Sequence, residues 1–581
     1  MKKLLALALA LCMITGCALA DTYVGAGKGN NGDIQVEVSF DGEKIESVTV
    51  KEHAETPGIS DPALETIPGA IVEAQSVDVD AVVGATNTSN GIKLAVADAA
   101  AQAGIVLPGM AAGEAAKKES LTADVVVVGG GIAGMAAALT AAEQGAQVIL
   151  VEKQAMLGGS GNLTAAGFYA TETDKVPASV EDHEEMYNHI LEMIDEGGDL
   201  ENVEKDRIRH LVDEGPALVA RLEGYGMEFA TTDFQIKDAK QHYHLLADGS
   251  NGPGQVKILS EQLQKVGVNV LLNTKCIALN QNEGKMCGIT AEQADGVFDI
   301  NAGAVVIAAG GYAHNPDMIM RLQPETLFSY SCANAGATGE VLQMAANLGA
   351  AWYKHQYMLT CGFTSDPANP SLSMVCYPPY ASMPLVDQTG KRFENEFLLW
   401  TLNSEMTKNV RNAPFYGIYD ANFLKGTAAE FKYASIEEAI ANGSNWVFKA
   451  DTLDELAAMI NVDAETFKET IARYNSVKGT SDPEPDFGVP NEQLSFVEEG
   501  PFYAVLMVSL NAGTMGGIKT QITGEVLDIH GEVIPGLYAA GESSNGGIYD
   551  RGYISGTSVL NCYIAGTDAG ASAAAYAAAG K

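Results

Sequence analysis

The 581-residue sequence predicts an α/β protein of several domains, and three observations support this. The run ADVVVV at residues 123–128 is a continuous apolar strand, followed at once by the glycine turn GGGIAG and an alanine-rich helix. Two later segments, AGAVVIAAGGY at 302–312 and EVIPGLYAAGE at 532–542, repeat the step from buried strand to glycines. Residues 352–505, between them, are richer in aromatics and prolines. We therefore expect a Rossmann-like domain in two sequence pieces with an inserted α+β capping domain, because one core does not accommodate so long a chain.

A small α+β domain is expected before the Rossmann-like one. The runs IQVEVSF and ESVTVKE alternate at period two around the turn DGEK, which indicates a hairpin. The following AVVGATNTSNGIKLAVADAAAQAG has helical, alanine-rich composition, and PGMAAGEAAKKES is typical of a linker. The expected divisions are a signal peptide at 1–16, the small domain at 17–106, a linker at 107–121, the Rossmann-like domain at 122–351 and 506–581, and the cap at 352–505.

The N-terminus is typical of a targeting segment. Lys2 and Lys3 precede an apolar run, Leu4 to Ile14, that is too short for a membrane span. The run ITGC, ending at Cys17, resembles the lipobox of bacterial lipoproteins, which implies acylation of Cys17 and a lipid-anchored protein on the extracytoplasmic face of the cell membrane. The alternative is an ordinary secretory peptide cut after Ala20.

Composition excludes some partners and groups. The formal net charge of -39 opposes binding to phosphate backbones, so no nucleic acid partner is expected. The cysteines show no CxxC or CxxCH spacing, which gives no signature of an iron–sulfur cluster or attached haem. No cluster of His, Cys and carboxylates predicts a metal site.

The turn after the first buried strand has the residues that a dinucleotide needs. Gly129, Gly131 and Gly134 form G-x-G-x-x-G, where the glycines allow a tight turn, close approach of a pyrophosphate and close helix packing. Glu152 ends the next strand, where an acid can bind a ribose hydroxyl.

Beyond this turn the chain is similar to a known superfamily. VEKQAMLGGSGNLTAAG, AAGGY, ATGEVLQMAANLGA and IPGLYAAGE resemble, in order, signatures of the FAD-dependent fumarate reductase/succinate dehydrogenase flavoproteins over roughly residues 122–575. The resemblance implies non-covalent FAD. It implies these further cofactor-binding residues: Ala133, Lys153, Gly159, Ser160, Gly161, Ala166, Gly167, Gly310, Glu340, Gly541, Glu542, Ser558 and Val559.

A second flavin is expected in the small domain. DAVVGAT, residues 80–86, resembles the flavinylation motif D-x-x-[ST]-G-A-T of FMN-binding domains, and ETPGI at 55–59 also matches that domain. The resemblance implies covalent FMN on the Thr86 hydroxyl, joined by a flavin transferase. Val83 departs from the motif because Ser or Thr is usual there. An extracytoplasmic enzyme cannot reach cytoplasmic NADH, so FMN would pass electrons from a membrane donor to FAD.

The catalytic pattern of the fumarate reductases fails at three places. Trp400 stands where GKRFxNExxxR of the family ends in its proton-donating Arg, and NAGTMGG, with Ala512 and Gly513, lacks the family's histidine. Tyr553 stands where an Arg clamps a carboxylate, although Arg551 is near enough in sequence to reach in. A dicarboxylate needs fixed cations, so a less charged substrate is expected.

Tyrosines are the candidates for catalysis. Tyr553 is the first choice as hydrogen-bond donor or acid, with Tyr549, Tyr377 and Tyr380 behind it, as tyrosines serve in ketosteroid dehydrogenases of the superfamily. The alternative is an aromatic wall that only shapes the pocket. His242 and His244 in QHYHL are expected to be packed or solvated rather than catalytic.

The sequence therefore predicts a flavoenzyme that reduces a polarised C=C bond of a small enone or enoate. One alternative is a 3-ketosteroid dehydrogenase-like enzyme running in the oxidative direction. The other is an electron-transfer flavoprotein without a small-molecule substrate.

Overall fold

The structure is a computed structural model that forms two compact units, residues 1–118 and 119–581. It describes residues 21–580 apart from 59, 83–84, 106, 108–116, 165, 197–199, 237–238, 328, 367–368, 376–382, 397–412, 423–429 and 550–552. Several expected residues lie outside this range: Cys17 with the signal peptide, Val83, Tyr377, Tyr380, Trp400 and Arg551.

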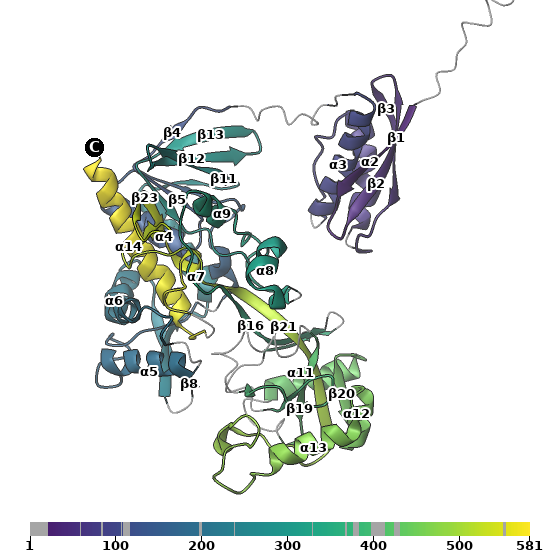
Figure 1. The fold of residues 1–581 in the computed structure, drawn as a ribbon, viewed down its shortest axis with the longest axis vertical. Helices are drawn as coiled ribbons and strands as arrows, with labels where there is room; N and C mark the ends of the chain where they lie inside the picture. Colours follow the sequence, from purple (N-terminus) through teal and green to yellow (C-terminus); the bar gives the residue numbers. More distant parts are fainter. Residues whose placement is uncertain are drawn as a thin grey trace, which may run out of the picture. The chain divides into compact units, whose positions relative to one another are not determined.

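The first unit is a three-stranded antiparallel sheet with two helices packed on it (Figure 1). Its elements are β1 (Asp21–Lys28), β2 (Asp33–Asp41), β3 (Lys44–Glu52), α2 (Asp61–Ala74) and α3 (Thr86–Gln102). The expected hairpin is β2–β3. Alternate β2 residues Ile34, Val36 and Val38 are fully buried beneath the helices, as the period-two pattern requires.

The centre of the second unit is a six-stranded sheet in the order β10-β6-β5-β14-β23-β22. The strands are β5 (Val125–Val128), β6 (Val148–Val151), β10 (Asn269–Leu271), β14 (Ala304–Ile307), β22 (Glu525–Leu527) and β23 (Val533–Ala539). All neighbours are parallel except β22 and β23. The last two strands come from the C-terminal piece of the chain, so the prediction of a Rossmann-like domain in two sequence pieces is confirmed.

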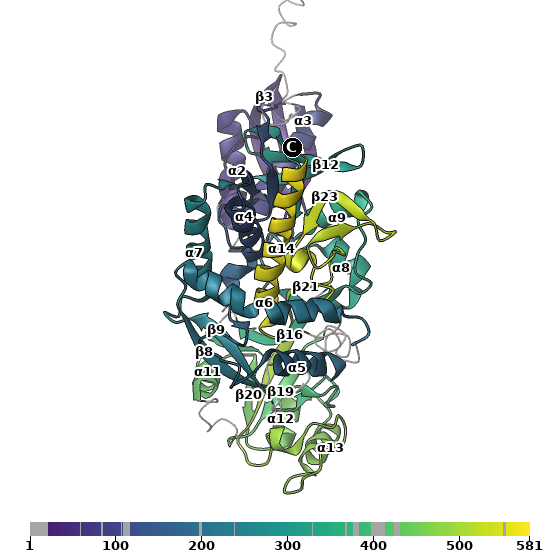
Figure 2. The ribbon, with the colours of Figure 1, turned by 90° about the vertical axis from the view of Figure 1, so that its left-hand side faces the viewer.

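Two small-residue helices cover one face of this sheet. Figure 2 shows α14 (Thr557–Ala579) running alongside α4 (Ile132–Glu143). A side chain at Gly566 or Gly570 would collide with the α4 backbone at Ala133 or Ala137, which explains the glycines. Within the described part of the chain, neither α14 nor any other helix is long and apolar enough to cross a membrane.

Further elements surround the central sheet. The strands form a sheet β11-β12-β13-β4 and a sheet β7-β9-β8. Their bounds are β4 (Leu121–Thr122), β7 (Phe168–Tyr169), β8 (Phe229–Ile236), β9 (Ala239–Leu246), β11 (Lys275–Asn282), β12 (Lys285–Gln293) and β13 (Gly296–Asn301). The helices are α5 (His183–Glu196), α6 (Lys205–Gly224), α7 (Asn251–Lys265), α8 (Pro316–Leu322) and α9 (Glu340–Asn347).

The inserted segment forms the α+β cap. Its strands are β16 (Tyr357–Asp366), β17 (Asn369–Val375), β18 (Leu385–Val386), β19 (Phe415–Tyr419), β20 (Val447–Ala450) and β21 (Phe502–Met515), and its helices α11 (Glu430–Ala441), α12 (Leu453–Met459) and α13 (Ala464–Asn475). The short strand β15 (Tyr330–Ser331) precedes this segment in the sequence and pairs with β21. The long strand β21 pairs with β15, β16, β19 and β20, and Figure 1 shows it leading from the cap into the rest of the unit. Residues near its end, Ala512 to Met515, line the cavity described below.

Candidate active site

The candidate site is a cavity of about 640 Å³ in the second unit. It extends from the turn between β5 and α4 to the start of α14, and it is also lined by β9, the start of α9 and the end of β21. The expected cofactor residues that line it are Gly129, Gly131, Ala133, Glu152, Lys153, Gly159, Ser160, Gly161, Gly167, Gly310, Glu340, Glu542, Ser558 and Val559. Thus the structure brings together nearly the whole set.

The glycine turn is built for close approach. Gly129 has φ +107°, and a side chain there or at Gly134 would collide with backbone, with Ala308 in one case and with Gly129 in the other. A Cβ at Gly131 or Gly310 would instead point into open space, with nearest atoms 4.0 and 3.9 Å away. Space left beside a turn at the start of α4 suits a pyrophosphate, so the residues fit a flavin dinucleotide.

Acidic and basic groups define the nucleotide end of the cavity. The Glu152 carboxylate, directly after β6, accepts a hydrogen bond from Gly130 N–H at 2.7 Å. Lys153 Nζ lies 3.0 Å and Lys275 Nζ 3.5 Å from the Glu340 carboxylate. Burial alone would raise the pKa of Glu340, but the Thr338 hydroxyl and Lys153 outweigh it and lower the pKa to about 2. Glu340 therefore stays ionised beside two cations.

The middle of the cavity is shaped by unusual backbone. The short 3-10 helix Gly159–Leu163 follows a positive φ at Gly158, and Ala166 has φ +51° without being glycine. The buried Gln255 amide donates to the Ala166 carbonyl at 2.9 Å, which holds that strained position. Ala166 and Gly541 are not cavity-lining in this structure; Gly541 meets Ala133 at the base of the turn.

Glu542 is a half-buried acid that lines the cavity. Its carboxylate accepts hydrogen bonds from Thr514 N–H at 2.8 Å and from the Thr514 hydroxyl at 2.9 Å. Burial raises the pKa of Glu542 above its ordinary value. The end of β21 is thereby fastened to the turn after β23.

Two tyrosines stand together at the far end of the cavity. The rings of Tyr549 and Tyr553 are 5.5 Å apart between centroids. Tyr549 is buried and its hydroxyl lies 2.6 Å from that of Thr557, whereas Tyr553 is half-buried. Burial raises the pKa of Tyr553 to about 12, with a hydrogen bond from Ser558 opposing the shift. Both phenols are therefore neutral hydrogen-bond donors at physiological pH.

The positive charge that the structure describes in the cavity lies at the nucleotide end. Among the cavity-lining residues that the structure describes, Lys153 and Lys275 are the only lysines or arginines, and both pair with Glu340. Ala512 and Gly513 also line the cavity, and a Cβ at Gly513 would come within 3.1 Å of the Glu542 carboxylate. The tyrosine end thus presents apolar atoms and hydroxyls rather than a described cation.

The histidines of QHYHL face away from the cavity. His242 Nδ1 lies 2.8 Å from the Asp233 carboxylate, and His244 stacks on Phe168 and lies 2.9 Å from the Thr173 hydroxyl. The residue between them, Tyr243, lines the cavity and donates to Gln241 at 2.6 Å. We did not expect Tyr243; the two-residue alternation along β9 is the signal that separates it from its neighbours.

Other lining residues also escaped the sequence analysis. They include the three cysteines Cys276, Cys332 and Cys562, together with Asn545. No motif quoted above contains these four residues. Within the described ranges, no group of three or more His, Cys, Asp or Glu is placed to hold a metal ion.

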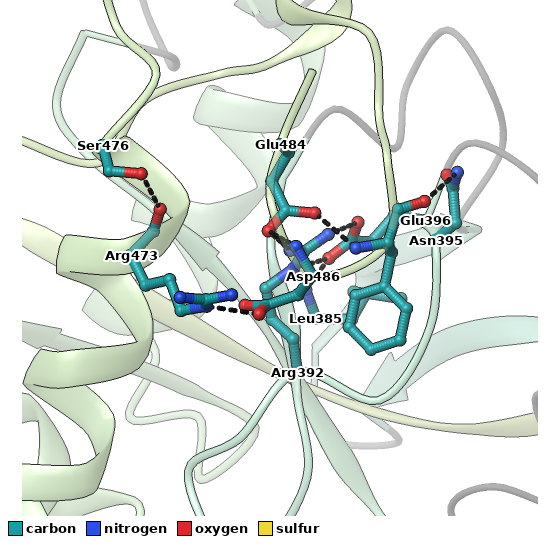
Figure 3. Close-up of polar contacts among 9 residues, drawn as sticks. Leu385, Arg392, Asn395, Glu396, Arg473, Ser476, Glu484 and Asp486 are labelled. Atoms are coloured by element: carbon teal, nitrogen blue, oxygen red, sulfur yellow. Dashed lines mark hydrogen bonds and ion pairs between the residues drawn. The ribbon is translucent and has the colours of Figure 1, made fainter. Parts of the chain in front are cut away.

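The segment GKRFENE, residues 390–396, forms the first part of the longer motif GKRFxNExxxR and has a structural role. Arg392 is buried, and its guanidinium contacts both oxygens of Glu396 at 2.7 and 2.6 Å and Glu484 at 2.6 Å (Figure 3). The Arg392 guanidinium also stacks over the rings of Tyr474 and Phe487. These contacts fasten the motif inside the cap, just before residues 397–412, which contain Trp400 and lie outside the described range.

Family models match both units. The FAD binding domain model matches residues 124–559, and the FMN-binding domain model matches residues 29–101. The fold is similar to the open conformation of a flavocytochrome c3 fumarate reductase, with TM-score 0.62 and 25% identity over 79% of each chain.

Several named relatives are similar in sequence over most of this chain. The chain is 31% identical to a vinyl phenol reductase of Lactiplantibacillus plantarum over 78% of this chain and 96% of the relative. It is 29% identical to a urocanate reductase of Eggerthella lenta over 96% of this chain and 93% of the relative. An NADH:acrylate oxidoreductase of Vibrio harveyi is 29% identical over 95% of this chain, which spans 61% of that longer protein. The chain therefore belongs to the FAD binding domain family, in the fumarate reductase-type flavoprotein superfamily, as a flavin-dependent oxidoreductase with an N-terminal FMN-binding domain.

Proposed function

We propose that this enzyme reduces the C=C bond of a small, weakly charged α,β-unsaturated ketone or aryl acrylate. The observation that carries the proposal is the tyrosine end of the cavity, where Tyr549 and Tyr553 stand together without a described cation. A dicarboxylate would lose its hydration there without gaining a charged partner among the described residues, which is costly. The names of the relatives, which include acrylate, vinyl phenol and urocanate reductases, support C=C reduction as the reaction type.

Each side chain has its own role in the proposed reaction. Bound FAD supplies the hydride for the β carbon. Tyr553, protonated because its pKa is about 12, donates a hydrogen bond to the substrate oxygen and stabilises the negative charge that grows there. Tyr549 fixes the Tyr553 ring, since its own hydroxyl is engaged with Thr557. The alternative role for the single O–H group of Tyr553 is to donate the proton that the α carbon takes up.

The FMN-binding domain is proposed to carry its flavin covalently on Thr86. Three hydroxyls follow one another closely in the run TNTS, and two of them are committed. Thr88 is buried and donates to the Glu55 carboxylate, and buried Ser89 donates to Ala85 at 2.9 Å. Thr86 begins α3 and is the hydroxyl that the motif resemblance selects.

The setting of the enzyme is likewise a proposal. The lipobox-like run implies a protein anchored by lipid on Cys17 outside the cytoplasm, where a flavin transferase matures it. A membrane donor then supplies two electrons through FMN to FAD for each C=C bond reduced. Membrane fractionation of Cys17→Ser tests the anchor: a variant that stays with membranes without a partner would contradict it.

Tyr553→Phe tests the reaction. The variant removes one hydroxyl and leaves the ring, so turnover with an aryl acrylate should fall by about 10²-fold or more, while FAD content stays unchanged. The matched control is Tyr225→Phe, which alters a tyrosine outside the cavity that hydrogen-bonds to Glu143. Unaltered turnover in Tyr553→Phe would reduce this residue to a wall of the pocket.

A further inference from the structure

A buried carboxylate stands behind the proposed modification site. Glu55 is 5% exposed and belongs to the run ETPGI. One of its oxygens accepts a hydrogen bond from the Thr88 hydroxyl, and the other accepts from Asn31 N–H at 2.8 Å. Burial alone raises the pKa of Glu55, but these hydrogen bonds outweigh it and leave the pKa below the ordinary value. The carboxylate is therefore ionised and joins the β1–β2 turn to the first turn of α3.

The same turn of α3 is held from other sides. The Asn87 amide donates to the Asn30 side chain at 2.9 Å. Ser89 accepts from Val82 N–H at 3.0 Å, which closes the residues before the helix onto its first turn. The Asn31 amide in turn donates to the Thr56 hydroxyl at 2.9 Å, so the Glu55 segment and the β1–β2 turn are tied to each other.

Glycines let the sheet come close enough for these contacts. A side chain at Gly27 would collide with the carbonyl of Gly91 on α3, and one at Gly91 would come within 2.9 Å of Gly29. The helix therefore lies directly against β1 along its first half. Backbone contact with β1 sets the position of α3 along its axis, and Glu55 fixes the first turn of α3.

We propose that Glu55, acting through Thr88, is a positioning residue that presents Thr86 for flavin transfer. The inference rests on the proposed covalent attachment at Thr86. In that step a bond forms between Thr86 Oγ and the FMN phosphorus of a flavin dinucleotide as its P–O–P bond breaks. The leaving group is AMP, which carries the second phosphate of the dinucleotide, and the Thr86 hydroxyl proton passes to the transferase. Such an in-line attack depends on placement of the acceptor to within a fraction of an ångström, which a fixed first turn supplies.

The decisive variants are Glu55→Gln, Thr88→Val and Thr88→Ser. The first removes the charge, the second removes the hydroxyl at constant shape, and the third restores a hydroxyl. The full-length chain, expressed without a transferase, is incubated with excess flavin transferase, Mg²⁺ and FAD, and intact mass is followed with time. Glu37→Gln is the control because its carboxylate makes a surface ion pair with Lys51 on the same unit.

The rate and the final extent of modification separate positioning from folding. We expect Glu55→Gln and Thr88→Val to slow modification by about tenfold or more, as loss of a charge-assisted hydrogen bond implies, at full final extent. Thr88→Ser and Glu37→Gln should stay within about twofold of the wild type. Wild-type rates in Glu55→Gln and Thr88→Val would overturn the proposal. A lower final extent of modification at an unchanged rate would also overturn it, because that result marks a fraction of unfolded chains. Thr86→Ala separately tests the attachment site: a mass gain in that variant would refute Thr86 itself.

Discussion

Replacing Glu396 by Ala removes the main partner of a buried arginine in the cap. Arg392 loses two hydrogen bonds, of 2.7 and 2.6 Å, and among the described residues keeps Glu484 as its charged partner. Leu385 N–H, which donates to Glu396 at 3.0 Å, is left without its acceptor. Breaking a buried pair by removing one partner costs about 3–5 kcal/mol, and an orphaned N–H adds about 1–3 kcal/mol. With Glu484 still in place, we expect the cap to lose about 4 kcal/mol of stability.

Native-state hydrogen exchange measures this loss within the cap. The slowest amides of β18 and β19 should exchange about 10³-fold faster in Glu396→Ala, because each 1.4 kcal/mol corresponds to a factor of ten. Lys478→Ala is the matched control: it breaks an ion pair with Glu498 on the cap surface, which is worth less than about 1 kcal/mol. An exchange increase of tenfold or less in Glu396→Ala would refute the account of this cluster.

Three other outcomes follow from the same contacts. Gly134→Ala should purify without FAD, since the added methyl would collide with the Gly129 carbonyl, and a stoichiometric flavin spectrum would contradict this. The first unit should lose stability as the pH falls from 4.5, the ordinary pKa of a glutamate, through the lower pKa that Glu55 has in the folded state. The acid unfolding curve of Glu55→Gln, followed by circular dichroism, should lack that step. An acid transition identical to that of the wild type would refute the assignment. Because the pKa of Tyr553 is about 12, turnover should show no loss from tyrosine ionisation until the pH nears that value. If the pH–rate profile inflected several pH units lower and Tyr553→Phe abolished that inflection, the result would contradict a neutral Tyr553 donor.

The nucleotide-binding part of the fold was predictable because its signals are local. The buried strand, the glycine turn and Glu152 follow one another within one βαβ unit, and the glycine steps after β14 and β23 mark the same edge of the sheet. Strand β1 was not expected, because DTYVGAGK carries Gly25 and Gly27, which serve contact with α3 rather than strand propensity.

The substrate end of the site was predictable only in part. Tyr553 was found because it replaces an Arg of a recognisable pattern, and Tyr549 was a weaker candidate close to it in the sequence. Tyr243 was missed, since its importance depends on which face of β9 meets the cavity, and this is decided by pairing with the distant strand β7. The second acidic partner of Arg392 was not predicted, for the same reason. Glu484 follows α13, and nothing near GKRFENE in the sequence points to it.

The most direct test of the account is anaerobic reoxidation of the reduced protein by a panel of unsaturated compounds. The panel holds fumarate, an aryl acrylate, a vinyl phenol and an α,β-unsaturated ketone, each followed by the return of oxidised flavin absorbance. We expect fast reoxidation by at least one weakly charged compound and slow reoxidation by fumarate, because the tyrosine end of the cavity offers hydroxyls and no described cation. Brisk reoxidation by fumarate, with none by the other three, would contradict the proposed substrate class.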